Sequence, residues 1–300
     1  MMSSGGRIVA LSIHRKTLSN AAKSLLPGIW IFVLPLAGAG FELTPPADPA
    51  AQGITVVSLN VANAGSAAEL ADEVRERGLD RADVYLLQEV VGEGSGKSRF
   101  AEALLGRRRM HVYYLGSIDL DGGRLGGLAI VSRLPLRDPR SIQLKKNNLN
   151  FRSRNRIAIG ATVNGPSGPV ALLTTHLDTR INAQQRLEQL KPIVDWAAAG
   201  GLPTIFGGDL NTNPYRWVFH LMPVPAREMQ GETVRKYMGD CGFESAIRGR
   251  EATHDVLGMQ LDWVFLKGLQ ASSTRVVALR NSDHHAVVTT VVAAESGGTQ

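Results

Sequence analysis

Residues 202–211 read LPTIFGGDLN, an apolar run that passes directly into an acid and an amide. Such a run predicts a buried strand that ends in a loop. Residues 179–200 before it, TRINAQQRLEQLKPIVDWAAAG, have the clearest helical spacing in the chain and end at a glycine pair. Residues 169–176, PVALLTTH, predict a further strand. A strand, a helix and a second strand in succession indicate an α/β fold.

The same elements continue in both directions along the chain. Strands are predicted in ITVVSLNVA (54–62), DVYLLQEV (83–90), GGLAIVS (126–132) and RIAIGATV (156–163), and a helix over residues 66–79. Strands cluster near the C-terminus, in LDWVFLKG, SSTRVVAL and AVVTTVV. This pattern predicts one α/β (α+β) domain over residues 54–293, with mixed sheets and outer helices. The glycine-rich motifs of nucleotide-cradling folds are absent from the sequence.

Composition sets the broad class of the protein. Hydrophobic residues make up 44% of the 300 residues, which is enough for a sizeable core and excludes wholesale disorder. The single cysteine, Cys241, excludes an internal disulfide framework and a multi-cysteine zinc site. The net charge of +6 owes much to residues 1–40, which hold four basic residues and no acid. Overall charge is therefore weak evidence for a polyanionic partner.

The N-terminal segment has the order of a secretory signal. A basic opening runs into an uncharged apolar stretch over residues 24–41, and Ala37-Gly38-Ala39 fits a cleavage site. We expect residues 1–39 to be a signal peptide or an N-terminal anchor, residues 40–53 a linker and residues 294–300 a tail. The protein would then be exported to the periplasm or outside the cell, or held at the membrane by this segment. A cytoplasmic protein with an apolar N-terminus is the remaining alternative.

Polar side chains gather where the predicted strands end or begin. Because strand ends at one sheet edge converge, these groups could share a pocket. Any one of them alone is typical of a turn, and Asp178 could instead cap the following helix. The residues are Asn60, Glu89, His176, Asp178, Asp209, Asn211, Asp262, Asp283 and His284.

These side chains suit hydrolysis of a phosphoester. Carboxylate and amide oxygens make a hard site for Mg²⁺ or Mn²⁺, which offsets negative charge on phosphoryl oxygens. An imidazole and a second carboxylate can handle protons. Serine catalysis fits less well because no G-x-S-x-G motif is present. A calcineurin-like centre is also disfavoured, because Thr212 stands where that motif needs an acid.

The order LN, QE, SR, THLD, GDLN, LDW, SDHH resembles that of the endonuclease/exonuclease/phosphatase superfamily, whose fold is DNase I-like. The resemblance spans residues 54–293, and GGLAIVSRLPL (126–136) resembles a further strand of that family. It implies a four-layer fold, in which a two-layer mixed β-sandwich is flanked by helices. It also implies a metal-dependent phosphoester hydrolase.

The resemblance assigns a metal side to the pocket. Glu89 resembles the main metal-binding carboxylate, and Asn60 the amide beside it that helps to hold metal and phosphate. Asp283 resembles a second carboxylate on the metal side. The implied cofactor is Mg²⁺ or Mn²⁺.

It also assigns catalytic roles. His284 resembles the catalytic histidine and Asp262 the carboxylate that orients it. Asp209 resembles the acid that orients or deprotonates the attacking water. His176 and Asn211 resemble the histidine and the amide that contact the phosphate.

One basic stretch bears on the substrate. No acid occurs between Asp138 and Asp178, and this interval is either a phosphate-binding lip or a solvated strand edge. Arg154 and Arg156 resemble family arginines that touch phosphate. The basic residues of the interval are Arg140, Lys145, Lys146, Arg152, Arg154 and Arg156.

The substrate class stays open between several phosphate compounds. The basic stretch weakly favours a nucleic-acid phosphodiester. A phospholipid headgroup, an inositol phosphate or a sugar phosphate are alternatives, and an apolar hairpin would favour lipid. The short segment LMPVP (221–225) is the nearest candidate, and we expect no such hairpin from it. A catalytically silent binding module would lack motif residues, and none is missing. We expect a monomer.

Overall fold

The structure is a computed structural model that describes residues 53–61, 66–93, 97–105, 110–120, 123–147, 149, 155–226 and 229–294. The predicted signal or anchor, nearly all of the linker and the tail from residue 295 lie outside these residues, as does Arg154. Within the described part of the chain, no helix is long and apolar enough to cross a membrane.

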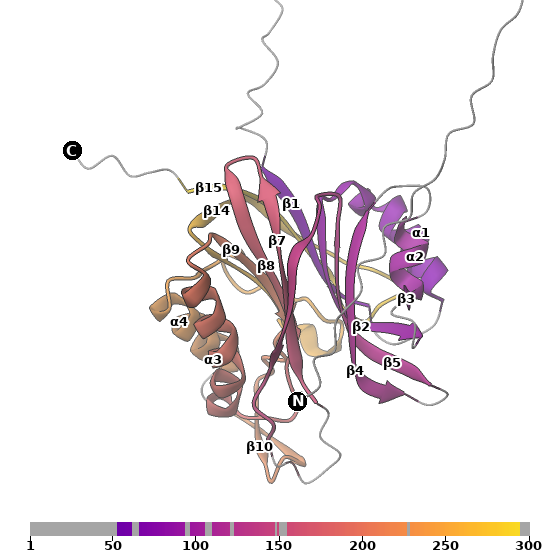
Figure 1. Ribbon diagram of the computed structural model, residues 1–300. Coiled ribbons are helices and arrows are strands. Elements are labelled where there is room, and N and C mark those ends of the chain that lie inside the picture. The colour runs from indigo at the N-terminus through magenta and orange to yellow at the C-terminus, as the bar shows by residue number, and fades with distance from the viewer. Residues whose placement is uncertain are drawn as a thin grey trace, which may run out of the picture.

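Two mixed β-sheets pack face to face (Figure 1). The first sheet has the strand order β14-β15-β1-β2-β5-β4, with β3 beside β2, and the second β12-β13-β9-β8-β7-β6. The pairs β1–β2 and β8–β9 are parallel and the other neighbours are antiparallel. The strands of the first sheet are β1 (Ile54–Asn60), β2 (Val84–Glu93), β3 (Lys97–Ser98), β4 (His111–Leu120), β5 (Arg124–Ser132), β14 (Leu269–Val277) and β15 (Ala286–Ala293). Those of the second are β6 (Arg137–Gln143), β7 (Ile157–Gly165), β8 (Gly168–His176), β9 (Thr204–Asp209), β12 (Glu244–Ser245) and β13 (Asp262–Lys267).

Helices cover the outer faces of both sheets (Figure 1). The first sheet is covered by α1 (Ala67–Glu76) and α2 (Arg99–Leu105), the second by α3 (Ala183–Gly200) and α4 (Gln230–Asp240). The expected four-layer, helix-flanked fold is thereby confirmed. The hairpin of β10 (Tyr215–Val218) and β11 (Met222–Pro225) and the edge strand β6 were not predicted. The 3₁₀ turns are η2 (Leu79–Arg81) and η3 (Val256–Gly258).

The central strands are apolar on both faces because each face packs against a different layer. In β1, Val56 belongs to the core between the sheets, whereas Val57 and Leu59 pack under α1 and α2. A strand buried on both faces needs a continuous apolar run instead of alternation. This explains why these strands were readable in the sequence.

The parallel pairs require crossover helices, and α3 supplies the one between β8 and β9. It begins later than residue 179 because Asn182 caps it: the Asn182 side chain accepts from the backbone of Gln185, whose side chain accepts from the Asn182 backbone. It ends at Gly201 in the left-handed conformation, with φ 63°. The chain therefore enters β9 beside the first half of β8, as their parallel pairing requires.

Strand register then aligns the candidate residues. The parallel β8–β9 pair sets His176 opposite Asp209, and the antiparallel β9–β13 pair sets Asp262 opposite the same residue. In the other sheet, Asn60 pairs with Gln88, one residue before Glu89. Asn60, His176, Asp209 and Asp262 therefore lie at strand ends, as the sequence indicated, whereas Glu89 lies within β2, which continues to Glu93.

Candidate active site at the strand ends

Asp209 is the centre of the site, and its side chain is only 2% exposed. Its Oδ2 atom accepts a hydrogen bond from Asn60 Nδ2 at 3.0 Å. The same oxygen lies 3.4 Å from His176 Nε2 and 3.8 Å from His284 Nε2. Its Oδ1 atom accepts from the backbone N–H of Asn211 at 2.9 Å. Asp209 and four other residues predicted from the sequence therefore lie together around the Asp209 carboxylate, and the five come from four separate motifs.

His284 is held by a fully buried carboxylate. Its Nδ1 atom lies 2.8 Å from Asp262 Oδ2, and this contact assigns the neutral-state proton to Nδ1, with Nε2 directed toward Asp209. Burial on its own disfavours the imidazolium. The charges of Asp262 and Asp209 and the hydrogen bond to Asp262 overcome that effect and raise the pKa of His284 to about 10. The imidazole is therefore a cation at neutral pH.

Asp209 has a higher pKa than an ordinary surface acid. Burial, with the charge of Asp262, raises the pKa of Asp209 to about 6, against the effects of His284 and of the hydrogen bonds from Asn211 and Asn60. A carboxylate with a pKa near the working pH is well suited to accept a proton in a reaction. The two neighbours therefore divide into a candidate base, Asp209, and a candidate cation, His284.

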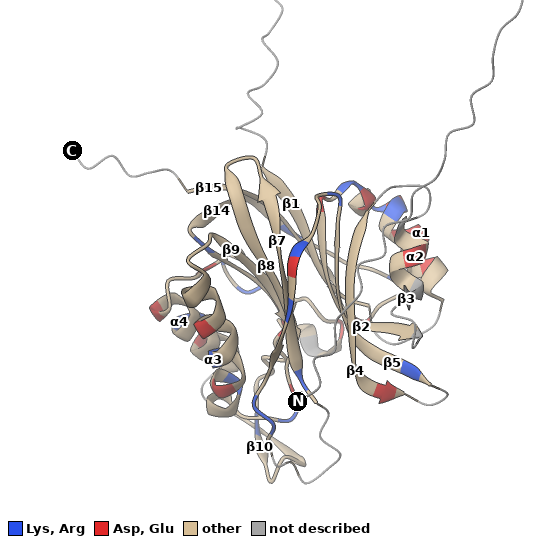
Figure 2. Ribbon diagram, viewed as in Figure 1, with Lys and Arg blue, Asp and Glu red and all other residues tan. Residues whose placement is uncertain are grey.

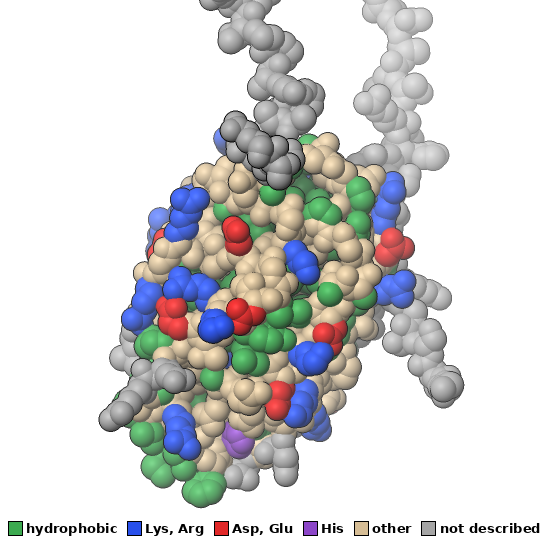
Figure 3. All heavy atoms as spheres, turned by 90° about the vertical axis from the view of Figure 1, so that its left-hand side faces the viewer, with side chains coloured by type: hydrophobic (Ala, Val, Ile, Leu, Met, Phe, Trp, Pro, Cys, Tyr) green, Lys and Arg blue, Asp and Glu red, His purple; other side chains and the backbone are tan. Residues whose placement is uncertain are grey.

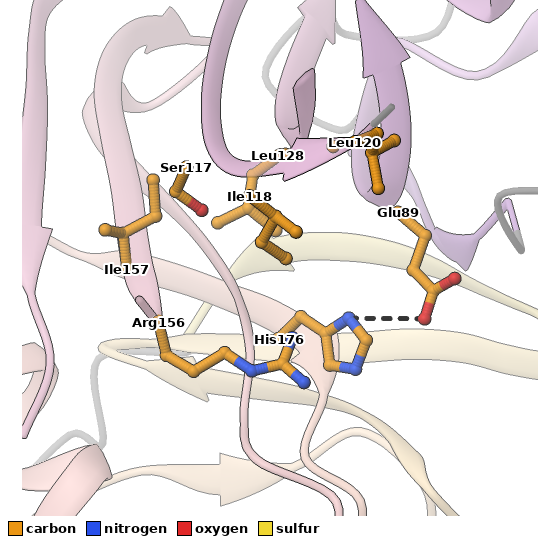
Figure 4. Close-up of a pocket in the computed structure, with 10 residues that line it drawn as sticks. Glu89, Ser117, Ile118, Leu120, Leu128, Arg156, Ile157 and His176 are labelled. Atoms are coloured by element: carbon orange, nitrogen blue, oxygen red, sulfur yellow. Dashed lines mark ion pairs between the residues drawn. The ribbon is translucent and has the colours of Figure 1, made fainter. Parts of the chain in front are cut away.

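Glu89 approaches the same histidine from the other sheet. The β2–β5 pairing is irregular between Leu87 and Val90, and Glu89 adopts φ 56°, which is unfavourable for a residue with a side chain. Such irregularities re-aim side chains next to functional sites. Here Glu89 Oε1 lies 3.6 Å from His176 Nδ1 (Figure 4). About a quarter of the Glu89 side chain is exposed, so the carboxylate borders open space.

Asp178 does not cap the following helix, because Asn182 has that place. Instead its carboxylate accepts from Arg156 Nε at 3.1 Å and from Gln189 Nε2 at 2.8 Å. Arg156 also lines the cavity beside Glu89 and His176 (Figure 4). The structure therefore makes Asp178 a support for Arg156 and leaves Arg156 at the edge of the site.

Asp283 lies on the rim, with more than half of its side chain exposed. It contacts His254 Nε2 at 3.4 Å, and the His254 ring meets that of His284 edge to face at 4.6 Å. His254 Nδ1 accepts the backbone N–H of Val256, so the His254 proton lies on Nε2 and faces Asp283. Sequence reasoning missed His254, although it lies in ATHD just before the LDW motif.

Arg186 of α3 was also missed, and it holds the loops that carry the site. It is fully buried, and its Nη1 atom donates to the backbone oxygens of Asp178 and Leu210, which follow β8 and β9. Its Nε atom donates to Gln230 at 2.8 Å. The sequence did carry a signal for Arg186, because it lies on the same helical face as the apolar Leu190 and Ile193. An arginine on a buried face needs hydrogen-bond partners, so this spacing indicates a structural role.

The donor atoms at the site fit a hard divalent cation. Asn60 ends β1, and Glu89 lies at the irregularity within the neighbouring parallel strand β2; they supply amide and carboxylate oxygens, with Asp283 on the rim. Asp262 Oδ1 is buried without a hydrogen-bond partner among the described residues. In the described part of the chain, two groups of three side chains have ligand atoms within 4.8 Å of one another: His254, Asp283 and His284; and Asp209, Asp262 and His284.

The two-sheet fold, with a carboxylate, amide and histidine site at its strand ends, is of the DNase I-like type. Residues 57–284 match the Endonuclease/Exonuclease/phosphatase family, and the chain belongs to it. Members of this family are phosphoester hydrolases, generally dependent on a divalent metal. No curated protein sequence matches the chain.

Solved structures share the fold at low sequence identity. An endonuclease/exonuclease/phosphatase from Beutenbergia cavernae is 21% identical, with a TM-score of 0.64 over 81% of this chain and 72% of that one. The human Nocturnin catalytic domain, with bound sulfate, is 19% identical, with a TM-score of 0.60 over 81% and 94%. ANGEL2, a 2′,3′-cyclic phosphatase, is 13% identical, with a TM-score of 0.56 over 80% and 95%.

Proposed function

We propose that this protein hydrolyses phosphodiesters by direct attack of water, with a divalent cation as cofactor. The observation that carries the proposal is the contact of Asp209 with Asn60 and with two histidines. A carboxylate in that position can accept a proton from water, and the neighbouring histidine and amide groups supply hydrogen-bond donors beside it. A catalytically silent module needs no such pairing of a raised acid with a charged imidazole.

In the proposed reaction, water attacks phosphorus, its proton passes to Asp209, and the bond to the ester oxygen breaks. His284 Nε2 lies only 3.8 Å from Asp209, so both groups serve the side of the attacking water. Since the leaving oxygen departs from the opposite side, we assign His284 a hydrogen bond to a phosphoryl oxygen. His176 and Asn211 are assigned the same task. Mg²⁺ or Mn²⁺ held by Glu89, Asn60 and Asp283 would offset negative charge on the leaving oxygen.

Nucleic acid is our first candidate substrate. Arg140, Lys145 and Lys146 are exposed, and Gln189 joins the Lys145 backbone oxygen to Asp178, so the basic loop lies beside the site. Further Lys and Arg residues, shown in blue, lie near the β10 label in Figure 2. Positive charge at this place would attract a polyanion. The pairing of Arg156 with Asp178 leaves a smaller basic lip than the sequence indicated.

A phospholipid headgroup is the second candidate. The β10–β11 hairpin exposes apolar side chains next to the loop that carries Asn211 and Asn213. The expectation that no apolar hairpin exists was therefore wrong. Its two strands are four residues each, too short for the sequence pattern to reveal.

The test is hydrolysis by the full chain of DNA, RNA, sphingomyelin and inositol phosphates, each with Mg²⁺ and with a chelator. We expect Mg²⁺-dependent release of product from a phosphodiester and loss of at least about 100-fold in Asp209→Asn, the range for a positioned base. Arg275→Gln, an exposed change on β14 outside the site, is the control. Equal rates for Asp209→Asn and wild type would refute the proposed site.

A further inference from the structure

The β10–β11 hairpin exposes an apolar tip at the lower end of the molecule (Figures 1 and 3). Phe219 is 74% exposed, Met222 59% and Leu221 52%, while Val224 is 41% exposed. Of the five large hydrophobic residues exposed in the described part of the chain, four lie here. Clustered exposure of this kind marks an interaction site, whereas single exposed apolar residues are ordinary.

The turn of the hairpin holds its apolar tip against a conformational preference. Phe219 and His220 have φ 51° and 60°, and the Leu221 N–H donates to the Val218 oxygen, which closes a two-residue turn. Turns with two positive φ values favour Asn-Gly, and a bulky aromatic residue is an outlier there. Because backbone strain of this kind persists where it has a use, the outlier points to a task for Phe219.

The hairpin is fixed to the active site by paired hydrogen bonds. Asn182 accepts the backbone N–H of Trp217 at 2.8 Å and donates to its oxygen at 3.1 Å. Asn213 accepts from Trp217 Nε1 at 3.2 Å and also donates to the Asn211 oxygen. A surface that docks on this hairpin would therefore be held at a fixed place relative to Asn211.

The charges around the tip have one sign. Residues 210–227 contain no acid. Arg216 is exposed, and the Arg180 guanidinium lies 5.6 Å from the centre of the Trp217 ring. An apolar tip with flanking cations matches the interface of an anionic lipid bilayer, where apolar side chains enter the acyl boundary and arginines meet the headgroups.

We propose that the β10–β11 hairpin docks the protein on anionic phospholipid membranes, with Phe219, Leu221 and Met222 in the interface. The proposal does not depend on hydrolysis, and it is tested in chelator, where turnover is not needed. It is also separate from residues 1–39, because the measurement is local to the hairpin.

The experiment places an environment-sensitive fluorophore at Leu221→Cys in the full chain, with Cys241→Ala to remove the native thiol. Vesicles of phosphatidylcholine with phosphatidylglycerol are titrated, with and without brominated acyl chains. We expect a blue shift and quenching by bromine for the label at residue 221. A label at Val256→Cys, on the η3 turn and 55% exposed in the native chain, should show neither.

Four outcomes overturn the proposal. The label stays in water while the chain floats with vesicles; the chain does not float with vesicles; or the shift appears without lipid as protein concentration rises, which would indicate a second copy as the partner. A shift produced by an added protein instead of vesicles has the same consequence.

Three further variants, all carrying the label at residue 221, test the chemistry. Phe219→Ser should raise the half-saturating vesicle concentration about tenfold or more, as expected for loss of an inserted aromatic ring, whereas Val256→Ser should not change it. Arg216→Gln should raise it about fivefold on anionic vesicles and leave it unchanged on pure phosphatidylcholine. Equal effects of Arg216→Gln on both lipids would contradict the charge argument. Thermal melting checks that each variant folds.

Discussion

Glu73 on α1 anchors the loop that delivers His284, and its replacement should destabilise the protein strongly. Its side chain is 1% exposed. Its Oε1 atom accepts the backbone N–H of Arg280 at 2.7 Å, and its Oε2 atom that of Asn281 at 3.0 Å. The Asn281 amide adds a bond at 2.9 Å. The loop runs on to Asp283 and His284, so one carboxylate ties α1 to the site.

We expect Glu73→Gln to lower the free energy of unfolding by about 1.5–3 kcal/mol. A hydrogen bond to a charged group contributes about 1.5–3 kcal/mol, and glutamine keeps an acceptor for only one of the two backbone N–H groups, so one such bond is counted. The Arg280 guanidinium is left out because it is 69% exposed and its contact is screened by water. Glutamine keeps the shape, but one of its two ends is a donor that faces donors. The assay is urea denaturation of both proteins at pH 7.

The pH dependence gives an independent check. Burial alone would raise the pKa of Glu73, but the hydrogen bonds from Arg280 and Asn281 outweigh it and hold the pKa below its ordinary value of 4.5. A depressed pKa adds stability that is present above 4.5 and lost as the pH falls through the folded value. Wild type should lose this part in acid and Glu73→Gln should not.

Glu76→Gln is the matched control, because this acid on the same helix is 65% exposed and bonds only the Arg280 guanidinium in the described structure. It should cost less than about 1 kcal/mol. If Glu73→Gln also stays within about 1 kcal/mol of wild type, the carboxylate does not anchor the loop.

Four further outcomes are expected. The pKa of His284, raised to about 10 from 6.5, adds stability that is fully present below pH 6.5 and lost as pH rises through 10, so His284→Ala should lack that alkaline loss in urea titrations. Asp262→Asn and His284→Ala should each cost about 10²–10⁴ in kcat, and the double variant should be little worse than His284→Ala; multiplied losses would show independent residues. Glu89→Gln should need more Mg²⁺ for half-maximal activity, and equal Mg²⁺ curves would remove Glu89 from the metal side. We also propose export through residues 1–39, so sequencing of protein recovered outside the cytoplasm should begin near Gly40; a chain that starts at Met1 in the cytosol would contradict export.

The sequence predicted the centre of the site because strand ends carry both a hydrophobic and a chemical signal. Continuous apolar runs marked β1, β8 and β9, and an acid, amide or histidine followed at the point where each run stopped. Strand register then brings these residues together, because β9 pairs with β8 on one side and with β13 on the other. Strand length and polarity are local properties, so they can be read along the chain.

Side-chain partners could not be read in the same way. Whether Asp178 capped a helix or held Arg156 depended on a contact between residues 22 positions apart. Glu73 meets its partners across more than 200 positions, and nothing local distinguishes it from the solvated acids of α1. The hairpin was missed because its apolar character comes from a turn and two four-residue strands that no periodic pattern spans.

Buried negative charge at the site links the proposed cofactor to the proposed substrate. Asp209 and Asp262 are buried together, and the pKa of Asp209 is raised first by its own burial and then by the charge of Asp262. His284 compensates part of that charge. A phosphodiester bound there, as proposed, would bring further negative charge next to Glu89. Because buried like charges repel, a divalent cation held through Glu89 would offset that charge, and by linkage the cation and the phosphodiester would each raise the affinity for the other.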